Sequence, residues 1–330
     1  MFRDKKLRSG ILVSLLLAFA VVVTILLYAD ASRLLQALLH FHWEMLPLIL
    51  GLTLCNYALR FVKWHFYLHL LAIPLKLWPS LLIFLAGLSM AITPGKVGEL
   101  LKSYLLKERT GTAIRKTAPI IVAERLTDGI AMLLLAGVGL MQYRFGWQIL
   151  LILFIGGLGG IIIIQNRKLS LALLRHGERI PLVSPIVHWL RDFYESAFLL
   201  LRWQPLCLAV LLGVISWTGE CLALYFVYLG SGVSAGGDLL LKSIFILAVS
   251  SLVGSASTLP GGLGTTDGSI VGLTQFLVTA SATIAGAATI LIRFCTLWFG
   301  LFLGGIALIL YRTTQAGNTK NGLAEVTHTK

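Results

Sequence analysis

The sequence predicts an all-α integral membrane protein. Of its 330 residues, 57% are hydrophobic and 12% are charged, and the mean hydropathy is +0.88. Soluble domains carry a charge on roughly a quarter of their residues. Two dipeptides that break helices, Pro94-Gly95 and Pro260-Gly261, interrupt apolar runs. We therefore expect about six full transmembrane helices plus two re-entrant helix pairs, arranged as an inverted repeat.

The first two spans follow the first two apolar runs. A helix over about residues 10–28 has a longer apolar core than a signal peptide, which predicts an uncleaved span. A second span over about 46–71 carries Arg60 and Lys63. These two basic residues either snorkel at the inner membrane interface or belong to a site inside the protein.

The third apolar run ends at the first Pro-Gly break. We expect a helix over about 77–93 and a short one over about 96–106, which at about 1.5 Å per residue reaches only halfway across a bilayer. A re-entrant pair that enters and leaves on one side fits this length better than two spans. Backbone at the break must then be buried in protein or line a wet cavity, because lipid cannot satisfy its polar groups.

Three further helices follow in the middle of the chain. Apolar runs predict spans over about 117–141 and 147–164. Residues 186–202 place an apolar stripe opposite a charged face, which is typical of an interfacial helix. We expect that helix on the cytoplasmic surface of the membrane.

The carboxyl-terminal half repeats the plan of the first. We expect a span over about 206–229, a re-entrant pair over about 239–259 and 265–278, and a last span over about 284–311. Residues 313–330 are rich in Thr, Asn and Gly and predict a disordered cytoplasmic tail.

The two breaks indicate an internal repeat. Residues 255–264 match residues 89–98 at the Pro-Gly dipeptide and at the glycines Gly98 and Gly264. Glycines at a break let two backbones approach and bend.

The repeat also predicts an orientation. Repeat one covers about 46–141 and repeat two about 206–311, within a single membrane domain over residues 1–312. The extra span between the units inverts the second relative to the first. The first break then enters the membrane from the cytoplasm and the second from outside.

The basic residues that give the chain its net charge of +13 lie mostly between the apolar runs. Most of the 27 Lys and Arg residues fall in loops on the predicted cytoplasmic side, which places both termini in the cytoplasm. We interpret the charge as a topology signal and as contacts for anionic lipid head groups, and we expect no nucleic acid partner.

Ionisable residues inside the predicted spans define the candidate substrate site. Each costs about 2.5 to 3.5 kcal/mol at the bilayer centre, so an unpaired one is seldom retained without a role. Glu124 and Asp128 share a helix face and would repel each other without a nearby cation. Arg125, Arg293 or Lys96 is the candidate cation. The full set is Lys96, Glu99, Lys102, Glu124, Arg125, Asp128 and Arg293.

Two interpretations of these charges stay open. They form either a buried ion-pair network that fixes helix packing or a polar cavity that binds a lipid phosphate through Arg and Lys. Arg60, Lys63, Glu220 and Asp267 are secondary candidates. Asp267 either caps a helix or faces the cavity.

The sequence contains no catalytic motif and no metal-ligand spacing. All four cysteines lie in apolar runs, so we expect no disulfide, metal or cofactor. We therefore expect that the chain is not an enzyme.

Four motifs carry a resemblance to a known family. They are Pro94-Gly95-Lys96-Val97-Gly98-Glu99, Glu124-Arg125-Leu126-Thr127-Asp128, Arg60-Phe61-Val62-Lys63-Trp64 and Pro260-Gly261-Gly262-Leu263-Gly264. With them the sequence resembles the lysylphosphatidylglycerol synthase transmembrane-region family, also called flippase-like domain proteins, from about residue 10 to 312.

This resemblance implies a multi-pass protein of a bacterial or archaeal inner membrane. It is similar to the half of the multiple peptide resistance factor that moves aminoacylated phosphatidylglycerol between leaflets. The family's synthases also carry a soluble aminoacyl-transferase domain, which is absent here, so synthase activity is not expected. The second break has Gly262 in place of Lys96 and Thr265 in place of Glu99, so we expect the charged chemistry mainly in the amino-terminal half.

The leading hypothesis is a lipid flippase that binds an anionic phospholipid or a polyprenyl-phosphate-linked lipid. In it, Lys96, Lys102 and Arg125 bind the phosphate and Arg293 assists. The alternatives are a membrane subunit or enzyme that transfers a group to a lipid, and a structural membrane scaffold. Besides membrane lipids, a lipid-modifying synthase or a second copy of the chain is a candidate partner.

Overall fold

A computed structural model describes residues 5–93, 98–140, 147–168, 184–236 and 238–328. The protein is 86% helical, and these ranges contain no β-strand, which confirms the all-α prediction. The helices, in chain order, are α1 (Lys5–Tyr28), α2 (Ala31–Leu39), the 3-10 turn η1 (Trp43–Met45), α3 (Leu46–Leu70), α4 (Leu77–Leu88), α5 (Leu100–Thr110), α6 (Ile114–Leu140), α7 (Trp147–Gln165), α9 (Ser184–Leu200), α10 (Trp203–Gly230), α11 (Leu239–Ala256), the 3-10 turn η3 (Pro260–Gly262), α12 (Thr265–Leu277), α13 (Ala282–Arg293), the π-helical turn η4 (Phe294–Trp298) and α14 (Phe299–His328).

Four helical segments in the described part of the chain are long and apolar enough to cross a membrane. They are Trp43–Leu70, Trp203–Gly230, Leu239–Ala256 and Ala282–Gln315. A fifth is counted if α1 and α2, which are bent by 94° at Asp30, form one broken span. Length and composition thus support four or five spans, where the sequence predicts about six.

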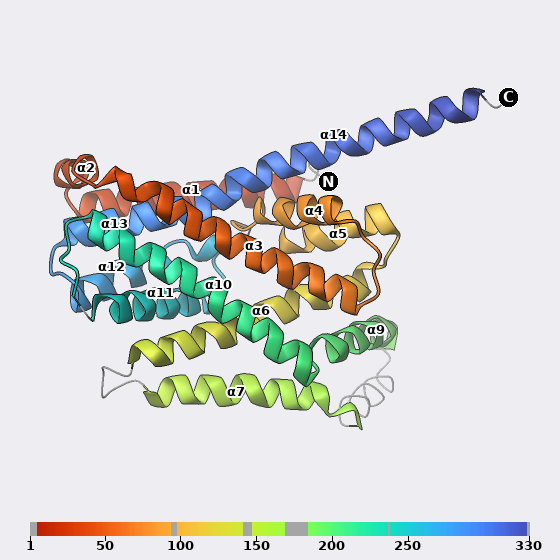
Figure 1. Ribbon diagram of the computed structural model, residues 1–330, viewed down its shortest axis with the longest axis horizontal. Helices are drawn as coiled ribbons and strands as arrows, with labels where there is room; N and C mark the ends of the chain where they lie inside the picture. The colour runs from red at the N-terminus through yellow and green to blue at the C-terminus, as the bar shows by residue number, and fades with distance from the viewer. Residues whose placement is uncertain (1–4, 94–97, 141–146, 169–183, 237, 329–330) are drawn as a thin grey trace.

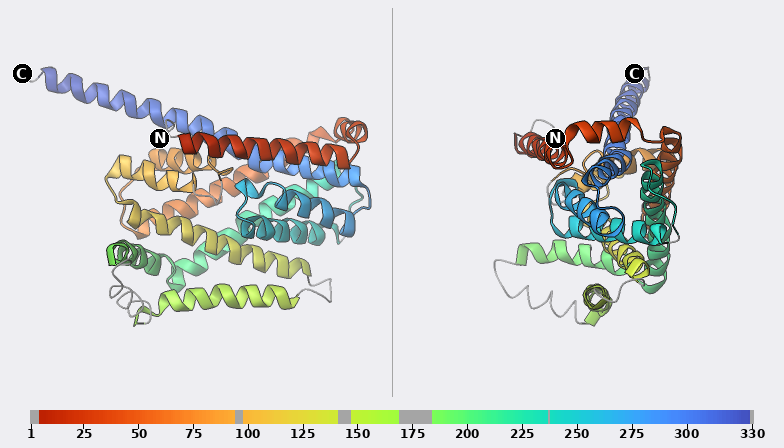
Figure 2. Two further views of the ribbon diagram at one scale, coloured as in Figure 1. Left: turned by 180° about the vertical axis from the view of Figure 1, so that it is seen from behind. Right: turned by 90° about the vertical axis from the view of Figure 1, so that its left-hand side faces the viewer.

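The long helices run side by side along one axis, and the short ones occupy its two ends (Figure 1). Helices α4 and α5 lie at one end of the bundle, and α11 and α12 lie at the other. The view from behind shows the same arrangement (Figure 2). Helix α4 packs against α14, and α11 packs against α6 and α12.

Helix α4 ends earlier than the sequence predicts, at Leu88 instead of residue 93. The hydroxyl of Ser89 donates to the carbonyl of Ala86 at 2.7 Å, and the hydroxyl of Thr93 accepts from the N–H of Gly98 at 2.8 Å. Such side chains compete with the helix for its backbone groups. The predicted break residues Pro94 and Gly95, with Lys96, lie outside the described residues.

The second break has the backbone that its glycines predict. Pro260 opens the turn η3, and Gly261 and Gly264 have φ angles of +59° and +84°. A side chain is strained in this left-handed region, so glycine is required there. Helix α12 begins directly afterwards, at Thr265.

Two segments differ from the prediction. The link after the first span contains α2, whose N-cap Asp30 accepts a hydrogen bond from the N–H of Ser32. Helix α14 continues to His328, through residues for which the composition predicts a disordered tail. Extending an existing helix needs no new nucleus, which is the costly step of helix formation.

Candidate functional site

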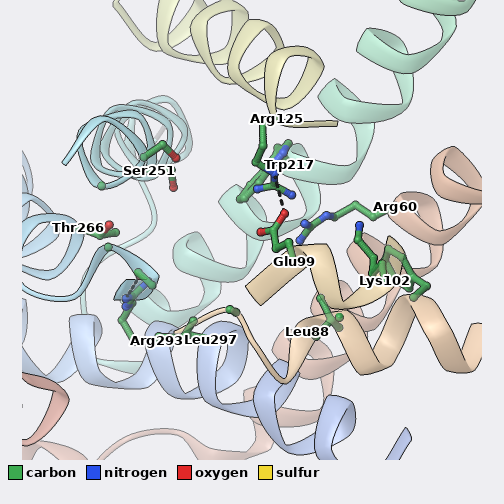
Figure 3. Close-up of a pocket in the computed structure, with 17 residues that line it drawn as sticks. Arg60, Leu88, Glu99, Lys102, Arg125, Trp217, Ser251, Thr266, Arg293 and Leu297 are labelled. Carbon is green, nitrogen blue, oxygen red and sulfur yellow. Dashed lines mark hydrogen bonds and ion pairs between the residues drawn. The ribbon is translucent and has the colours of Figure 1, made fainter. Parts of the chain in front are cut away.

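A polar cavity of about 160 Å³ lies between the helices that flank the two predicted breaks. On one side, α5 and its N-cap contribute Lys102 and Glu99; on the other, η3 and α12 contribute Gly261 and Thr266. Figure 3 shows basic side chains from separate helices pointing into this space. Its charged lining residues are Arg60, Glu99, Lys102, Arg125 and Arg293.

Lys102 forms a buried ion pair with Glu124 of α6. The two charged atoms lie 2.5 Å apart, and the side chains are only 6% and 4% exposed. The alkyl stem of Lys102 packs over Gly87 of α4, and its ammonium lies 4.7 Å from the centre of the Trp64 ring. Glu124 is therefore neutralised by Lys102, whereas Arg125, one of the cations that the sequence predicts for the pair of Glu124 and Asp128, contacts Asp128.

Asp128 is held by two cations. Lys63 of α3 forms a buried ion pair with it, and Arg125 lies 3.5 Å from its second oxygen. Arg125 also forms an ion pair with Glu99 at 3.3 Å, marked in Figure 3. Lys63 is 1% exposed, so it does not snorkel at the interface; it belongs to this network.

Asp267 caps α12 and also faces the cavity's basic residues. One carboxylate oxygen accepts the N–H of the N-cap residue Gly264 at 2.8 Å, which is the half of a capping box that the third helical residue supplies. The other lies 2.7 Å from the Nε atom of Arg293. Arg293 also donates to the carbonyl of Gly261 at 2.7 Å, so it ties the second break to α13.

The second half therefore repeats the charged chemistry of the first. Glu99 and Asp267 each lie just past a break, and each pairs with an arginine that follows 26 residues later, Arg125 and Arg293. Of the five charged residues that line the cavity in the described part of the chain, four still come from the amino-terminal half, as the sequence predicts. An alignment counted from the prolines places Thr265 opposite Glu99 and misses an acid two residues further on.

Arg60 has a different environment from the other basic residues. It lines the cavity and stacks over the indole of Trp217 at 5.8 Å, but in the described part of the chain it has no carboxylate within ion-pair distance. It also lines a second cavity of about 150 Å³, together with Tyr57 and Glu220. Arg60, Trp217 and Arg293 line both cavities, so the two adjoin each other.

An apolar groove of about 600 Å³ adjoins the polar cavity. Its walls are formed largely by α6, with Ala118, Ile121 and Val122. Glu99 and Arg125 line both the groove and the polar cavity. The site thus has a charged part and an apolar part that meet at one ion pair.

The structure brings most of the predicted site residues together. Lys96 lies outside the described residues, so its place in the site is still a prediction. The sequence did not indicate the neutral lining residues Trp217, Ser251 and Thr266. They lie in apolar runs without any local signal, and only the packing of α10, α11 and α12 places them at the cavity.

This arrangement defines a multi-pass helical membrane protein with a charged cavity between two broken helices. The family model described as the lysylphosphatidylglycerol synthase TM region matches residues 11–304. The chain belongs to that family.

Two curated relatives are both called UPF0104 membrane proteins. The one from Methanothermobacter thermautotrophicus is 24% identical over 315 residues, covering 88% of this chain and 90% of the relative. The one from Methanocaldococcus jannaschii is 24% identical over 233 residues, covering 67% and 92%. Both organisms are archaea, so the family is prokaryotic.

Proposed function

We propose that this protein is a lipid flippase that binds an anionic lipid, either a phospholipid or a polyprenyl-phosphate-linked lipid, in the polar cavity. The observation that carries this proposal is the continuity of a guanidinium-lined cavity with an apolar groove at Glu99 and Arg125. A lipid has the same two parts, a charged head group and apolar tails.

The basic residues suit a phosphate. Arginine presents planar donors that match phosphate oxygens in pairs, and Arg60, Arg125 and Arg293 reach the cavity from three different helices. The Nε atoms of Arg125 and Arg293 face Glu99 and Asp267, and these ion pairs hold both guanidinium groups at the cavity.

The groove suits the tails. It lies along α6 and is lined mostly by aliphatic side chains, so an acyl or isoprenoid chain in it contacts apolar surface while its phosphate reaches Arg125. A free phosphate or a nucleotide would leave this part of the site unused. The groove therefore favours a lipid over a soluble anion.

The two broken helix pairs suit transport. Each carries an acid-arginine pair just past its break, and the arginines of both pairs, Arg125 and Arg293, line the same cavity (Figure 3). In transporters built from inverted repeats, such discontinuous helices meet near the midplane, and movement of one repeat against the other opens the site to alternate sides. We infer that movement of one half of this protein against the other opens its cavity to alternate sides of the membrane, with both termini in the cytoplasm.

Native mass spectrometry with lipid identification tests the proposal. The purified protein is compared with Arg125→Gln and with the control Arg115→Gln, whose arginine is half exposed and pairs with Asp192 on the surface. We expect one discrete anionic lipid on the wild type and the control, and its loss in Arg125→Gln. Lipid exchange between leaflets is then measured in vesicles with the same three proteins; equal exchange by all three contradicts the proposal.

A further inference from the structure

Glu220 is the buried carboxyl group that the site described above leaves without a partner. It lies in α10, it is 7% exposed, and it lines the second cavity together with Arg60 and Arg293. A carboxylate at this depth is costly unless a cation neutralises it or a proton binds to it.

The other carboxylates of the site all have a cation at ion-pair distance. Glu124 pairs with Lys102 and Asp267 pairs with Arg293. Glu99 and Asp128 share Arg125, and Asp128 also has Lys63. Within the described ranges, Glu220 has no such cation. This difference separates it from the four acids that the network neutralises.

The groups that face Glu220 come from three helices. Helix α3 contributes Arg60 and Tyr57, α6 contributes Asp128, and α13 contributes Arg293. The Tyr57 hydroxyl donates to the carbonyl of Thr296 at 2.5 Å, so it is already engaged. The residues that α11 and α12 add to this cavity are neutral, and η1 contacts the far end of α10.

We propose that Glu220 is a proton-binding residue of the cavity, and that its proton is exchanged together with the anionic lipid. This inference rests on the proposed function for the lipid and extends it with a coupling ion. When the cavity holds no anion, the positive charges of Arg60 and Arg293 favour the ionised carboxylate. When a lipid phosphate binds these arginines, it neutralises that field, and Glu220 gains a proton.

The proton balance is simple. A hydronium ion that enters from the solvent supplies the proton as the lipid phosphate arrives: one of its O–H bonds breaks to leave water, and one O–H bond forms on the carboxylate of Glu220. The reverse transfer, from Glu220 to a water molecule, regenerates hydronium when the lipid leaves. The coupling between the two ligands is therefore reciprocal. Binding of the anionic lipid raises the affinity of Glu220 for a proton, and binding of the proton raises the affinity for the lipid by the same factor. The pair crosses the membrane with one negative charge fewer than the lipid alone, which lowers the cost of moving it.

Dicyclohexylcarbodiimide tests the proton site without any assay of transport. This apolar reagent attaches to protonated carboxyl groups in apolar surroundings, and peptide mass spectrometry identifies the residue that carries it. We expect modification at Glu220, more of it as the pH falls, and none at the neutralised Glu124 or Asp267. Failure to label Glu220 at mildly acidic pH, or equal labelling of all three, overturns the proposal.

A binding measurement tests the coupling. Affinity for the lipid found on the wild type is measured at mildly acidic and at alkaline pH, for the wild type, Glu220→Gln and the surface control Glu195→Gln. We expect tighter binding at acidic pH, by about tenfold for a coupling of about 1.4 kcal/mol, in the wild type and the control only. An unchanged pH dependence in Glu220→Gln refutes the coupling. A wild type that binds no lipid refutes the proposed function, while the labelling result still decides the proton site.

Discussion

The Nε atom of Arg293 lies 2.7 Å from a carboxylate oxygen of Asp267, although 26 residues separate them in the chain. Glu99 and Arg125 have the same separation and the same kind of contact in the other half. In both cases the acid follows a break in a membrane helix and the arginine lies in the helix after it. Each pair connects the residues that follow a break to a later helix, so the two halves of the protein use the same kind of ion pair at the same place.

This relationship predicts unequal effects of neutralising the two acids. Asp267→Asn weakens the hydrogen bond that this N3 carboxylate accepts from the N–H of Gly264, and it leaves Arg293 buried without its counter-ion, which costs about 3 kcal/mol. Glu99→Gln removes an ion pair with an arginine that is 29% exposed and that also contacts Asp128. We expect a clearly larger fall in the thermal unfolding temperature for Asp267→Asn. Equal falls in the unfolding temperature would show that the hydrogen bond from Asp267 to Gly264 and the burial of Arg293 add no stability.

Gly87 provides the second prediction, because its missing side chain makes room for Lys102. A Cβ atom at this position would lie 2.6 Å from the Cγ atom of Lys102, so Gly87→Ala has to displace the lysine from Glu124. We expect a loss of stability of about 1 to 3 kcal/mol and weaker lipid binding.

Gly137 of α6 is the matched control for that change. A Cβ atom there has no neighbour within 4 Å, so Gly137→Ala relieves only the helix penalty of glycine. We expect stability that is unchanged or higher by about 0.5 to 1 kcal/mol. If both alanine variants unfold at the same temperature as the wild type, the close packing of Gly87 on Lys102 is not important.

The parts of the fold that depend on local sequence were predictable. Apolar runs locate the helices, and the prolines and glycines locate the breaks, because both signals act on the residues that carry them. The number of spans was harder to predict, because α6 contains five charged residues, three of them (Glu124, Arg125 and Asp128) within its apolar part, and it is not among the helices that are long and apolar enough to span a membrane. In the structure, Glu124, Arg125 and Asp128 face neighbouring helices, and the sequence alone does not show which helices these are.

The partners within the site were not predictable. Lys102 meets Glu124, and Lys63 meets Asp128, because α5 and α3 pack against α6 in one register. A sequence shows which face of each helix is polar, but it does not show which positions along two helices lie next to each other. Of the cations expected beside Glu124 and Asp128, Arg125 contacts Asp128, but Lys102 and Lys63, which pair most closely with the two acids, were not among them.

Arg60 leads to the third prediction. As a cavity-lining arginine without a carboxylate partner in the described ranges, it has its donors available for a phosphate. Arg60→Ala should weaken binding of an anionic lipid by about ten- to a hundredfold, the value of one or two charge-assisted hydrogen bonds at about 1.5 to 3 kcal/mol. Arg60→Lys should recover part of this loss, because it keeps the charge but not the planar fork.

The control for Arg60 is Arg33→Ala, since Arg33 is 75% exposed and pairs with Asp30 at the membrane surface. Binding is measured for all variants by titration of lipid into detergent-solubilised protein. We expect Arg33→Ala to bind as the wild type does. Wild-type affinity in Arg60→Ala would show that this arginine only packs against Trp217.

The apolar groove gives the last prediction, which separates the binding of lipid tails from that of the head group. Val122 and Val138 both lie on α6 and are 46% and 45% exposed, but only Val122 lines the groove. Val122→Trp fills part of the groove, so we expect it to slow lipid exchange between leaflets in vesicles at least tenfold. A water-soluble head-group phosphate without tails should still bind, because the polar cavity is unaltered. Val138→Trp adds the same bulk to the lipid-facing surface and should exchange lipid at the wild-type rate. If both tryptophan variants exchange lipid normally, the tails follow another path, and the groove is not part of the transport site.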